Sequence, residues 1–441
     1  MKKTVLTGII CTIFAAQVQA GSELLTLINM LHENGTIDDA QYGRLMDEIN
    51  ANSKKPVKQK ETLQMQNDKE PAIELKIDKG GIQVKSSDNE FSAKIGGRVQ
   101  FDSAWYNEDG AEMGNGTEIR RARLYIQGHM FHDWGYKLQY DFTGAGKAGI
   151  KDAFITYNGF NHIQLKAGNI KDPFMLQEQT SSKFITFTER SLLDTFASGR
   201  HIGIMASTKH KHWTVSAGFF GDSVSTTTAG KDEGWGTSGR LTYAPINQKT
   251  RVVHLGIAGD YRETGDAGTV SFKQQAETHI SGANIVDTGI IAFADNTLKL
   301  GAELAIVEGA FSLQSEYIWT TVERNGNSGL DFDGWYVEAA YFLTGESRNY
   351  NKGKFAGISP DSVVGRGGFG AWQLAVRYST VDLNDHEIEG GWANSVTVGI
   401  NWFPTSTLRF SGNYVNVLDV DGGAYHGEEP SLFQVRGQWA F

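Results

Sequence analysis

Three arginines gather near the start of one short stretch, EIRRARLYIQG, at residues 118–128. Apolar residues recur at alternate positions in it, as in a β-strand with two unlike faces. Strict alternation puts Arg121 and Arg123 on one side with Ile119, and Arg120 on the other. Guanidinium groups bind oxyanions through paired N–H donors. The stretch therefore predicts a strand with an anion-binding face formed by Arg121 and Arg123. Arg120 falls on the opposite face by strict alternation, and it makes sense there only near a strand end or beside a β-bulge.

Basic residues also prevail on the polar faces of other strand-like segments. From about residue 72 to residue 441 apolar and polar residues alternate with a period of two. The basic residues that this alternation assigns to polar faces are Lys94, Arg98, Arg121, Arg123, Lys137, Lys166, Arg240, Lys299, Arg377, Arg409 and Arg436. The acidic residues on the same faces are Asp102, Asp141, Asp260, Glu303, Glu316 and Glu338. These faces are therefore predicted to be net positive.

The chain as a whole is acidic, with a formal net charge of −10, so no nucleic-acid partner is expected. Lys2 and Lys3 precede an apolar run that ends on the small-residue pattern VQA, which predicts a secretory signal peptide at residues 1–20. Its removal would take away Cys11, the only cysteine. We therefore expect neither disulfide nor thiol chemistry in the mature chain.

Composition and periodicity favour a membrane barrel over a soluble β-sandwich. Glycine accounts for 52 of 441 residues, and aromatic residues make up 11% of the chain. Tryptophans stand at the ends of strand-like segments, polar faces recur to the end, and the chain finishes on Phe441. Aromatic girdles and polar lumens are typical of outer-membrane barrels. We predict an all-β fold, a transmembrane antiparallel β-barrel of about 16 strands over residues 72–441.

The connections between these strands are expected to alternate between short turns and longer loops. The longer loops are predicted at 105–117, 221–237, 262–279 and 344–369. The segment 171–200 contains Pro173 and a mixed apolar pattern, and it is too long for a tight turn. In a barrel, a loop of this kind can fold inward and narrow the lumen.

Residues 21–50 have helical rather than strand periodicity, with leucines and isoleucines spaced three and four residues apart. Asp38, followed by Gln41 three residues later, resembles a capping box. We expect a short N-terminal α-helical hairpin or coiled coil. The charged residues 51–71 are predicted to form a linker.

At this point the chain resembles the phosphate-selective porin O and P family. The resemblance rests on segments in the family's order: KIGGRVQFD at 94–102, RRARLYIQG at 120–128, DWGYKLQYDF at 133–142, TSSKFITFTER at 180–190, VVHLGIAGDYR at 252–262, LTGE at 343–346, GAWQLAVRYS at 370–379 and GINWFPTSTLRFSGNYV at 399–415. It implies a trimeric outer-membrane barrel with an inward-folded third loop. It also implies a cationic pore for anions, phosphate or polyphosphate in the best-known members.

The resemblance assigns roles to four basic residues. Arg120 and Arg121 match the family's paired arginines near the constriction, and Lys183 and Arg190 match basic positions of the inward loop. We expect Arg123, Lys137, Lys151 and Lys171 to line the same pore. Lys94, Arg409 and Arg436 are expected to lie outside the constriction and simply to solvate a wide lumen.

Several positions depart from the phosphate-specific pattern. Glu178 and Gly135 stand where such members carry lysine, and Lys151 stands where they carry an acidic residue. Arg123 and Lys171 replace two pore tyrosines. The resemblance thus implies a cationic pore without implying strict phosphate selectivity.

No catalytic or metal-binding signature stands out. GRGGFG at 365–370 lacks the lysine of a phosphate-binding loop, DVDGG at 419–423 is too short for a calcium loop, and we find no nucleophile elbow. We predict neither an enzyme nor a cofactor or metal.

The function expected is an anion-favouring porin in the outer membrane of a Gram-negative bacterium, with its N-terminal segment in the periplasm. Its partners would be small anions such as phosphate, outer-membrane lipid and two further copies in a homotrimer. A weakly selective or cation-preferring porin, a structural barrel anchored by the N-terminal helices and an outer-membrane hydrolase remain alternatives.

Overall fold

The computed structural model describes residues 29–30, 32–35, 38–53, 72–78, 81–110, 112–144, 146–226 and 230–441. The chain divides into two units, Met1–Lys69 and Glu70–Phe441, which are considered separately. The predicted signal peptide, and the predicted linker apart from residues 51–53, lie outside the described residues. No helix in the described part is long and apolar enough to cross a bilayer.

The first unit contains helix α2 (Asp39–Ser53), which runs three residues into the predicted linker. Its start has the predicted capping box: the Gln41 side chain accepts from the Asp38 backbone N–H at 3.0 Å, and the Asp38 carboxylate accepts from the Gln41 backbone N–H at 2.8 Å. The predicted partner helix falls largely on residues outside the described part, so the hairpin stays a prediction.

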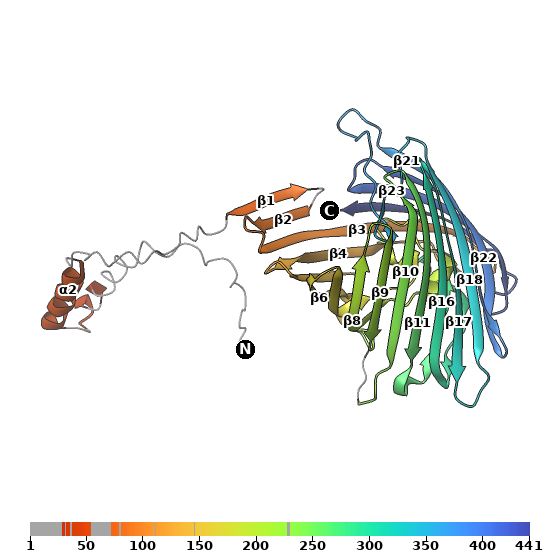
Figure 1. Ribbon diagram of the computed structural model, residues 1–441, viewed down its shortest axis with the longest axis horizontal. Helices are drawn as coiled ribbons and strands as arrows, with labels where there is room; N and C mark the ends of the chain where they lie inside the picture. The colour runs from red at the N-terminus through yellow and green to blue at the C-terminus, as the bar shows by residue number, and fades with distance from the viewer. Residues whose placement is uncertain are drawn as a thin grey trace. The chain divides into compact units, whose positions relative to one another are not determined.

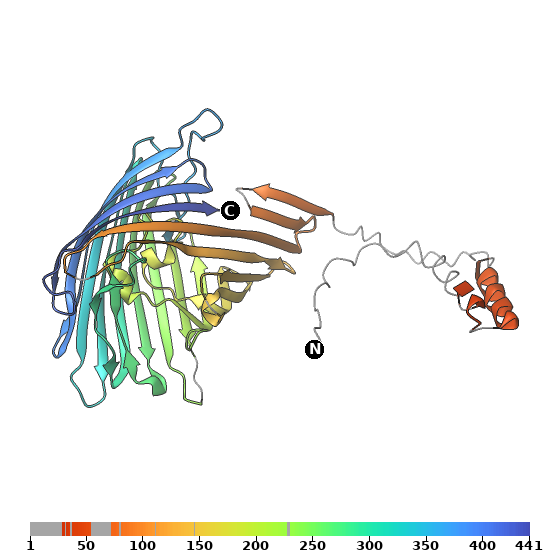
Figure 2. The ribbon, with the colours of Figure 1, turned by 180° about the vertical axis from the view of Figure 1, so that it is seen from behind.

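The second unit is a closed antiparallel barrel of sixteen strands, as predicted (Figures 1 and 2). Its strands are β3 (Phe91–Asn107), β4 (Gly116–Met130), β5 (Trp134–Asp141), β6 (Ile150–Phe160), β7 (Ile163–Lys171), β8 (Arg200–Lys209), β9 (Trp213–Phe220), β10 (Trp235–Asn247), β11 (Arg251–Glu263), β16 (Ala294–Glu308), β17 (Phe311–Arg324), β18 (Leu330–Phe342), β21 (Ala371–Asp385), β22 (Ile388–Phe403), β23 (Leu408–Asp421) and β24 (Ser431–Ala440). Each pairs with its neighbour, and β24 pairs with β3 to close the ring.

Apolar side chains lie on the outside of this barrel and polar ones on the inside. In β3, Phe101 and Trp105 are about half exposed, whereas Gln100 and Asp102 are buried. The same inversion holds in β24, where Phe433 is exposed beside a buried polar neighbour. This pattern confirms the alternation read from the sequence, because a lipid-facing wall requires an apolar exterior.

A two-stranded hairpin precedes the barrel. It consists of β1 (Ile73–Asp78) and β2 (Gly81–Ser86), and β2 pairs with the first residues of β3. The hairpin therefore continues the sheet beside β3, next to the end of the seam with β24.

The last residue of the chain, Phe441, pairs with Gly97 of β3 beside the seam of the barrel. The backbone N–H of Phe441 donates to the Gly97 carbonyl at 3.0 Å, and Gly97 returns a bond of 2.8 Å. A side chain at Gly97 would come within 2.8 Å of the Phe441 ring, so this close approach requires glycine.

One of the predicted loops, 344–369, lies at the opposite end of the barrel from the others. The connection between β16 and β17 is only Gly309–Ala310, which fixes the turn end of the barrel. From this end β17 runs to the opposite end of the barrel and β18 runs back. The segment between β18 and β21 therefore lies at the turn end. The expected alternation of turns and loops was wrong here. This segment forms its own small hairpin from β19 (Tyr350–Asn351) and β20 (Lys354–Phe355).

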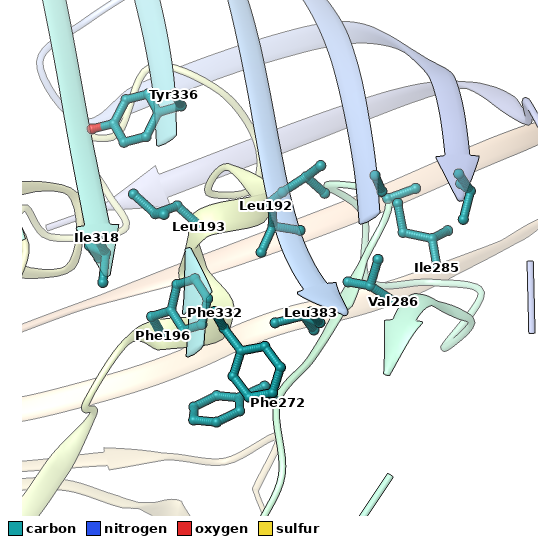
Figure 3. Close-up of a cluster of buried hydrophobic side chains, with 14 of the residues drawn as sticks. Leu192, Leu193, Phe196, Phe272, Ile285, Val286, Ile318, Phe332, Tyr336 and Leu383 are labelled. Atoms are coloured by element: carbon teal, nitrogen blue, oxygen red, sulfur yellow. The ribbon is translucent and has the colours of Figure 1, made fainter. Parts of the chain in front are cut away.

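Two loops from the other end pack together among the inward faces of the strands. One is 172–199, with the short helix α3 (Leu176–Gln179) and the 3-10 helix η2 (Leu192–Phe196). The other is 264–293, with the 3-10 helix η3 (Gly265–Ala267) and the strands β12 (Thr269–Val270), β13 (Lys273–Gln275), β14 (Asn284–Asp287) and β15 (Ile291–Ala292). Figure 3 shows Leu192, Leu193 and Phe196 in one buried apolar cluster with Phe272 and with Phe332 from the wall.

This second inward segment was not predicted from the sequence, which gave only a loop at 262–279. Its burial is explained by Phe272, Ile285 and Val286, which complete the apolar cluster. Buried apolar side chains on the inner wall, such as Ile318 and Val322, provide the other half. The lumen is therefore partly filled by a core rather than lined throughout by polar groups.

Candidate functional site

The stretch at 118–128 forms part of β4, and a β-bulge interrupts it at its arginines. Gln100 of β3 pairs with Arg121 and the next residue of β3, Phe101, pairs with Ile119, which leaves Arg120 as the extra residue. The bulge resets the alternation, so two consecutive arginines face the interior. Ile119 consequently points outward and is half exposed, which corrects its assignment to the arginine face.

Both arginines contact a carboxylate on the inward segment 172–199. Arg120 donates from Nε and Nη2 to the two carboxylate oxygens of Glu189 at 2.9 and 3.1 Å. Arg121 donates to the same two oxygens at 3.4 Å and to Gln100 at 3.0 Å. The bulge predicted as one explanation for Arg120 is thus present, and it serves this contact.

A cavity of about 430 Å³ lies between the wall and the inward segments. Ten basic side chains line it: Arg98, Arg121, Arg123, Lys137, Lys166, Lys171, Lys183, Arg190, Arg200 and Lys354. The two carboxylates in its lining are Asp152 and Glu178. A second cavity of about 520 Å³ at the turn end shares Lys137 and Lys166 with it and adds Lys94 and Lys209. The linings of these two cavities are therefore strongly biased toward cations, although the chain as a whole is acidic.

Six of the ten cations are held by carboxylates. Arg123 pairs with Asp141 at 2.5 Å, and Asp152 accepts from both Lys137 and Arg200, at 2.5 and 2.8 Å. Of the other three paired cations, Arg121 pairs with Glu189, and Lys171 and Arg190 both pair with Glu178.

The remaining four cations, Arg98, Lys166, Lys183 and Lys354, have no ion pair with any carboxylate that the structure describes. They are the cations whose charge is available to a solute. Lys166 and Lys183 instead lie over aromatic rings, Lys166 at 4.7 Å from the centroid of Phe154.

Glu178, which departs from the phosphate-specific pattern, is fully ionised at neutral pH. Its carboxylate accepts from Lys171 at 3.1 Å and from Arg190 at 2.8 Å. Burial alone would raise the pKa of Glu178, but the charges of Arg190 and Lys171 outweigh it and lower that pKa to about 2. Glu178 therefore neutralises part of the cationic lining.

Lys183 of the inward segment and Lys354 of the β19–β20 hairpin, neither of which pairs with a described carboxylate, have weakened basicity. Burial, with the nearby positive charge of Arg98, lowers the pKa of Lys183 to about 8. Burial, with the charges of Lys137 and Lys209, likewise lowers the pKa of Lys354 to about 8. Each cation is destabilised by its neighbours of the same sign, which an anion between them would relieve.

The cavity contains six of the eight residues predicted for the pore: Arg121, Arg123, Lys137, Lys171, Lys183 and Arg190. Arg120 is not part of the lining and donates to Glu189. Lys151 lies at the start of β6 and donates to the Ala148 carbonyl at 3.0 Å, so its ammonium is not part of the lining. Whether these residues bind anions stays a prediction.

Sequence reasoning missed Arg200 and Lys354 in this lining. Arg200 is the first residue of β8, where alternation is a poor guide because the strand is only beginning. Lys354 lies in the β19–β20 hairpin, in a segment taken for an external loop. No local pattern marks either of them, since only the closed barrel brings them to the cavity.

Arg409 and Arg436 do not simply solvate the lumen, which corrects the expectation for them. Both are buried, and Arg409 donates to the Ile185 carbonyl of the inward segment at 2.6 Å. Arg436 donates to the Thr188 carbonyl and, at 2.6 Å, to the Glu189 carboxylate. They attach the segment to β23 and β24, while Glu316 of β17 accepts from the backbone N–H of Leu176 at 2.6 Å. The segment therefore extends between β17 and the strands at the seam.

Residues 93–441 match the family described as phosphate-selective porin O and P. The chain belongs to this family. It is 32% identical over 361 residues to an uncharacterised protein of Caulobacter vibrioides, covering 78% of this chain and 71% of that one. It is 28% identical over 386 residues to Porin O of Pseudomonas aeruginosa, covering 76% of this chain and 85% of that one.

Solved structures of porins share the barrel fold at low sequence identity. An anion-selective porin from Comamonas acidovorans matches with a TM-score of 0.54 and 14% identity, covering 80% of this chain and 100% of that one. OmpT of Vibrio cholerae, an outer-membrane protein, matches with a TM-score of 0.53 and 10% identity over 80% and 98% of the two chains. Family membership and fold together make this chain an outer-membrane porin and point to a channel rather than an enzyme.

Proposed function

We propose that this porin favours anions and that the inward segment 172–199 forms its constriction. The observation that carries the proposal is the cavity lining, in which ten basic side chains face two carboxylates although the whole chain is acidic. A low-dielectric wall focuses the field of such a lining and raises the local concentration of anions. Rings of lysine and arginine are a common means by which pores select anions.

The proposed route continues from this cavity to the turn end, where the second cavity shares part of its lining and adds Lys94 and Lys209. In outer-membrane barrels the short turns face the periplasm. An anion would therefore pass from the constriction along lysines into the periplasm. Lysine is a mobile point charge and suits transient contact rather than tight binding.

Phosphate and other oxyanions are the proposed solutes, because unused donors accompany the free charges. Arg98 Nε and Ser182 Oγ are buried and have no hydrogen-bond partner among the described residues. Both residues line the cavity, where Lys183 also lies. An oxyanion offers several acceptor oxygens to such donors, whereas chloride is a single spherical acceptor.

Planar-bilayer recordings test the proposal. In a KCl gradient the reversal potential is expected to have the sign of a chloride-permeable pore, and added phosphate is expected to reduce the chloride current. A cation-selective reversal potential would overturn the assignment. Deletion of residues 181–188 is expected to increase conductance if the segment narrows the pore, and unchanged conductance would contradict the constriction.

A weakly selective general porin is the second candidate, and the ion pairs favour it. Asp152 and Glu178 pair with four of the cavity's cations, so the free charge is smaller than the count of basic residues suggests. This candidate predicts a reversal potential close to zero and no reduction of current by phosphate.

Assembly and orientation complete the proposal. Homotrimers, with the N-terminal segment in the periplasm and the apolar exterior against outer-membrane lipid, fit the family and the exposed Phe101 and Trp105. A solved form of OmpT of Vibrio cholerae is described as a trimer. Cross-linking in outer membranes, with protease added from the outside only, tests both statements.

A further inference from the structure

The arginine cluster at the bulge is already occupied, and its occupant belongs to the chain itself. The Glu189 carboxylate accepts hydrogen bonds from Arg120, Arg121 and Arg436, five in all. Three guanidinium groups around one oxyanion form the arrangement by which proteins bind phosphate or carboxylate ligands. Only Arg121 of these three also lines the cavity.

We propose that Arg120, Arg121 and Arg436 form an oxyanion site for which Glu189 acts as a built-in competing ligand, keeping Arg121 from binding permeating anions tightly. The proposal deepens the proposed anion-favouring function and rests on it. A permeating phosphate would approach Arg121 from the cavity side. It would have to share that guanidinium with Glu189, so its residence there would be short.

The distances indicate that Glu189 does not fully occupy the hydrogen-bond donors of Arg121. Glu189 holds Arg120 at 2.9 Å and Arg436 at 2.6 Å, but it holds Arg121 only at 3.4 Å. Arg436 is in addition held by Asp102 at 2.5 Å. Arg121 is therefore the most weakly held arginine of the cluster, and it is the one that lines the pore.

The position of Glu189 is firmly fixed, as a competing ligand requires. Its backbone carbonyl accepts two hydrogen bonds of 3.2 Å from the buried Arg377 of β21. The Thr188 backbone N–H, one residue earlier, donates to Asn413 at 2.8 Å. Burial alone would raise the pKa of the Glu189 carboxyl, but Arg121, Arg120 and Arg436 lower that pKa well below its usual range. The carboxylate thus stays ionised throughout the physiological range.

Glu189→Gln tests the inference, because glutamine keeps the shape and one acceptor but loses the charge. The concentration of inorganic phosphate that halves the chloride current is expected to fall by roughly tenfold or more, since a hydrogen bond to a charged group contributes on the order of one tenfold step in affinity. The reversal potential is expected to shift further toward that of chloride. The matched control is Glu308→Gln, which removes the same charge from an exposed pair with Arg251 at the turn end.

Arg120→Gln provides an independent test of opposite sign. Without Arg120, the Glu189 carboxylate can turn toward Arg121 while its backbone stays held by Arg377, so phosphate is expected to block the current less strongly than in the unaltered protein. Folding of each variant is checked by heat-modifiable migration in SDS gels. If Glu189→Gln does not fold, Arg120→Gln alone decides, and an unchanged or stronger phosphate block would overturn the inference.

For Glu189→Gln, a phosphate block and reversal potential equal to those of Glu308→Gln would also overturn it, because Glu189 would then be only an anchor. Failure of the proposed function is seen separately, in a cation-selective reversal potential of the unaltered protein. Even then, the difference between Glu189→Gln and the unaltered protein would still show whether Glu189 competes for Arg121.

Discussion

The buried pair of Glu277 and Arg377 attaches the second inward segment to the wall, and its removal has a calculable effect. Arg377 donates to the Glu277 carboxylate from Nη2 and, at 3.2 Å, from Nε, and both side chains are about 1% exposed. Removing one partner of a buried pair costs about 3–5 kcal/mol because the other charge is left uncompensated. Arg377→Met should therefore raise the population of a detached segment by roughly a hundredfold or more.

Trypsin cleavage of the folded protein in detergent measures this opening. Lys273 lies in the segment with an exposed side chain, and cleavage there requires local unfolding. When closing is fast compared with cleavage, the cleavage rate follows the population of the open form. Arg377→Met should accelerate cleavage at Lys273 by about a hundredfold. Arg377→Met with Glu277→Gln should accelerate it much less, because no buried charge is then left unpaired.

Arg377 also contacts the first inward segment, which separates its role from that of Glu277. It donates to the Glu189 carbonyl and lies 4.4 Å from the centroid of the Phe187 ring. Arg377→Met should therefore also expose Lys183 and Arg190 to trypsin, whereas Glu277→Gln should not. The reasoning is refuted if Arg377→Met changes cleavage at Lys273 less than tenfold, or if the double variant shows the product of the two single effects.

Three further predictions concern charge and closure. The pKa of Lys183 and that of Lys354 lie at about 8, so both positive charges are lost as the pH rises through 8. Anion selectivity measured in a KCl gradient should therefore fall between pH 7 and pH 9. A selectivity that does not change over this range would contradict the prediction. Glu178→Gln removes an ionised carboxylate from the lining and should increase the chloride-to-potassium permeability ratio severalfold, since a nearby charge contributes about 1 kcal/mol after screening. A methyl group at Gly97 would lie 2.5 Å from the Arg123 carbonyl oxygen, so Gly97→Ala should reduce the heat-modifiable folded band, whereas Gly412→Ala, with 3.6 Å to its nearest neighbour, should not.

The strands and their faces were predictable because each depends on a local signal. Alternation assigns Gln100 to the interior and Phe101 to the exterior, and lipid outside the barrel enforces that choice along the whole strand. Alternation fails where the backbone gains a residue. The bulge at Arg120 turns Ile119 outward, and only the pairing with β3 reveals where the extra residue lies.

The contents of the barrel were much less predictable, because long-range contacts decide them. Arg409 and Arg436 look like solvated lumen charges, yet both bind backbone carbonyls of a segment more than two hundred residues away in sequence. Lys354 reaches the cavity through a segment that resembles an ordinary external loop. Nothing near these residues in sequence identifies their partners.

Pairing of charges reconciles the proposed preference for anions with a barrel interior rich in carboxylates. A pore that bound anions with all ten cations would hold them too tightly to conduct, since conduction requires sites that release as readily as they bind. Asp152 and Glu178 reduce the free charge of Lys137 and Arg190, while Arg98 and Lys183 stay unpaired. The carboxylates therefore lower the affinity of the lining, and the unpaired cations preserve its sign. Removing a carboxylate should strengthen anion binding. Beyond some affinity, the stronger binding should slow the anion current, because each anion then leaves its site more slowly.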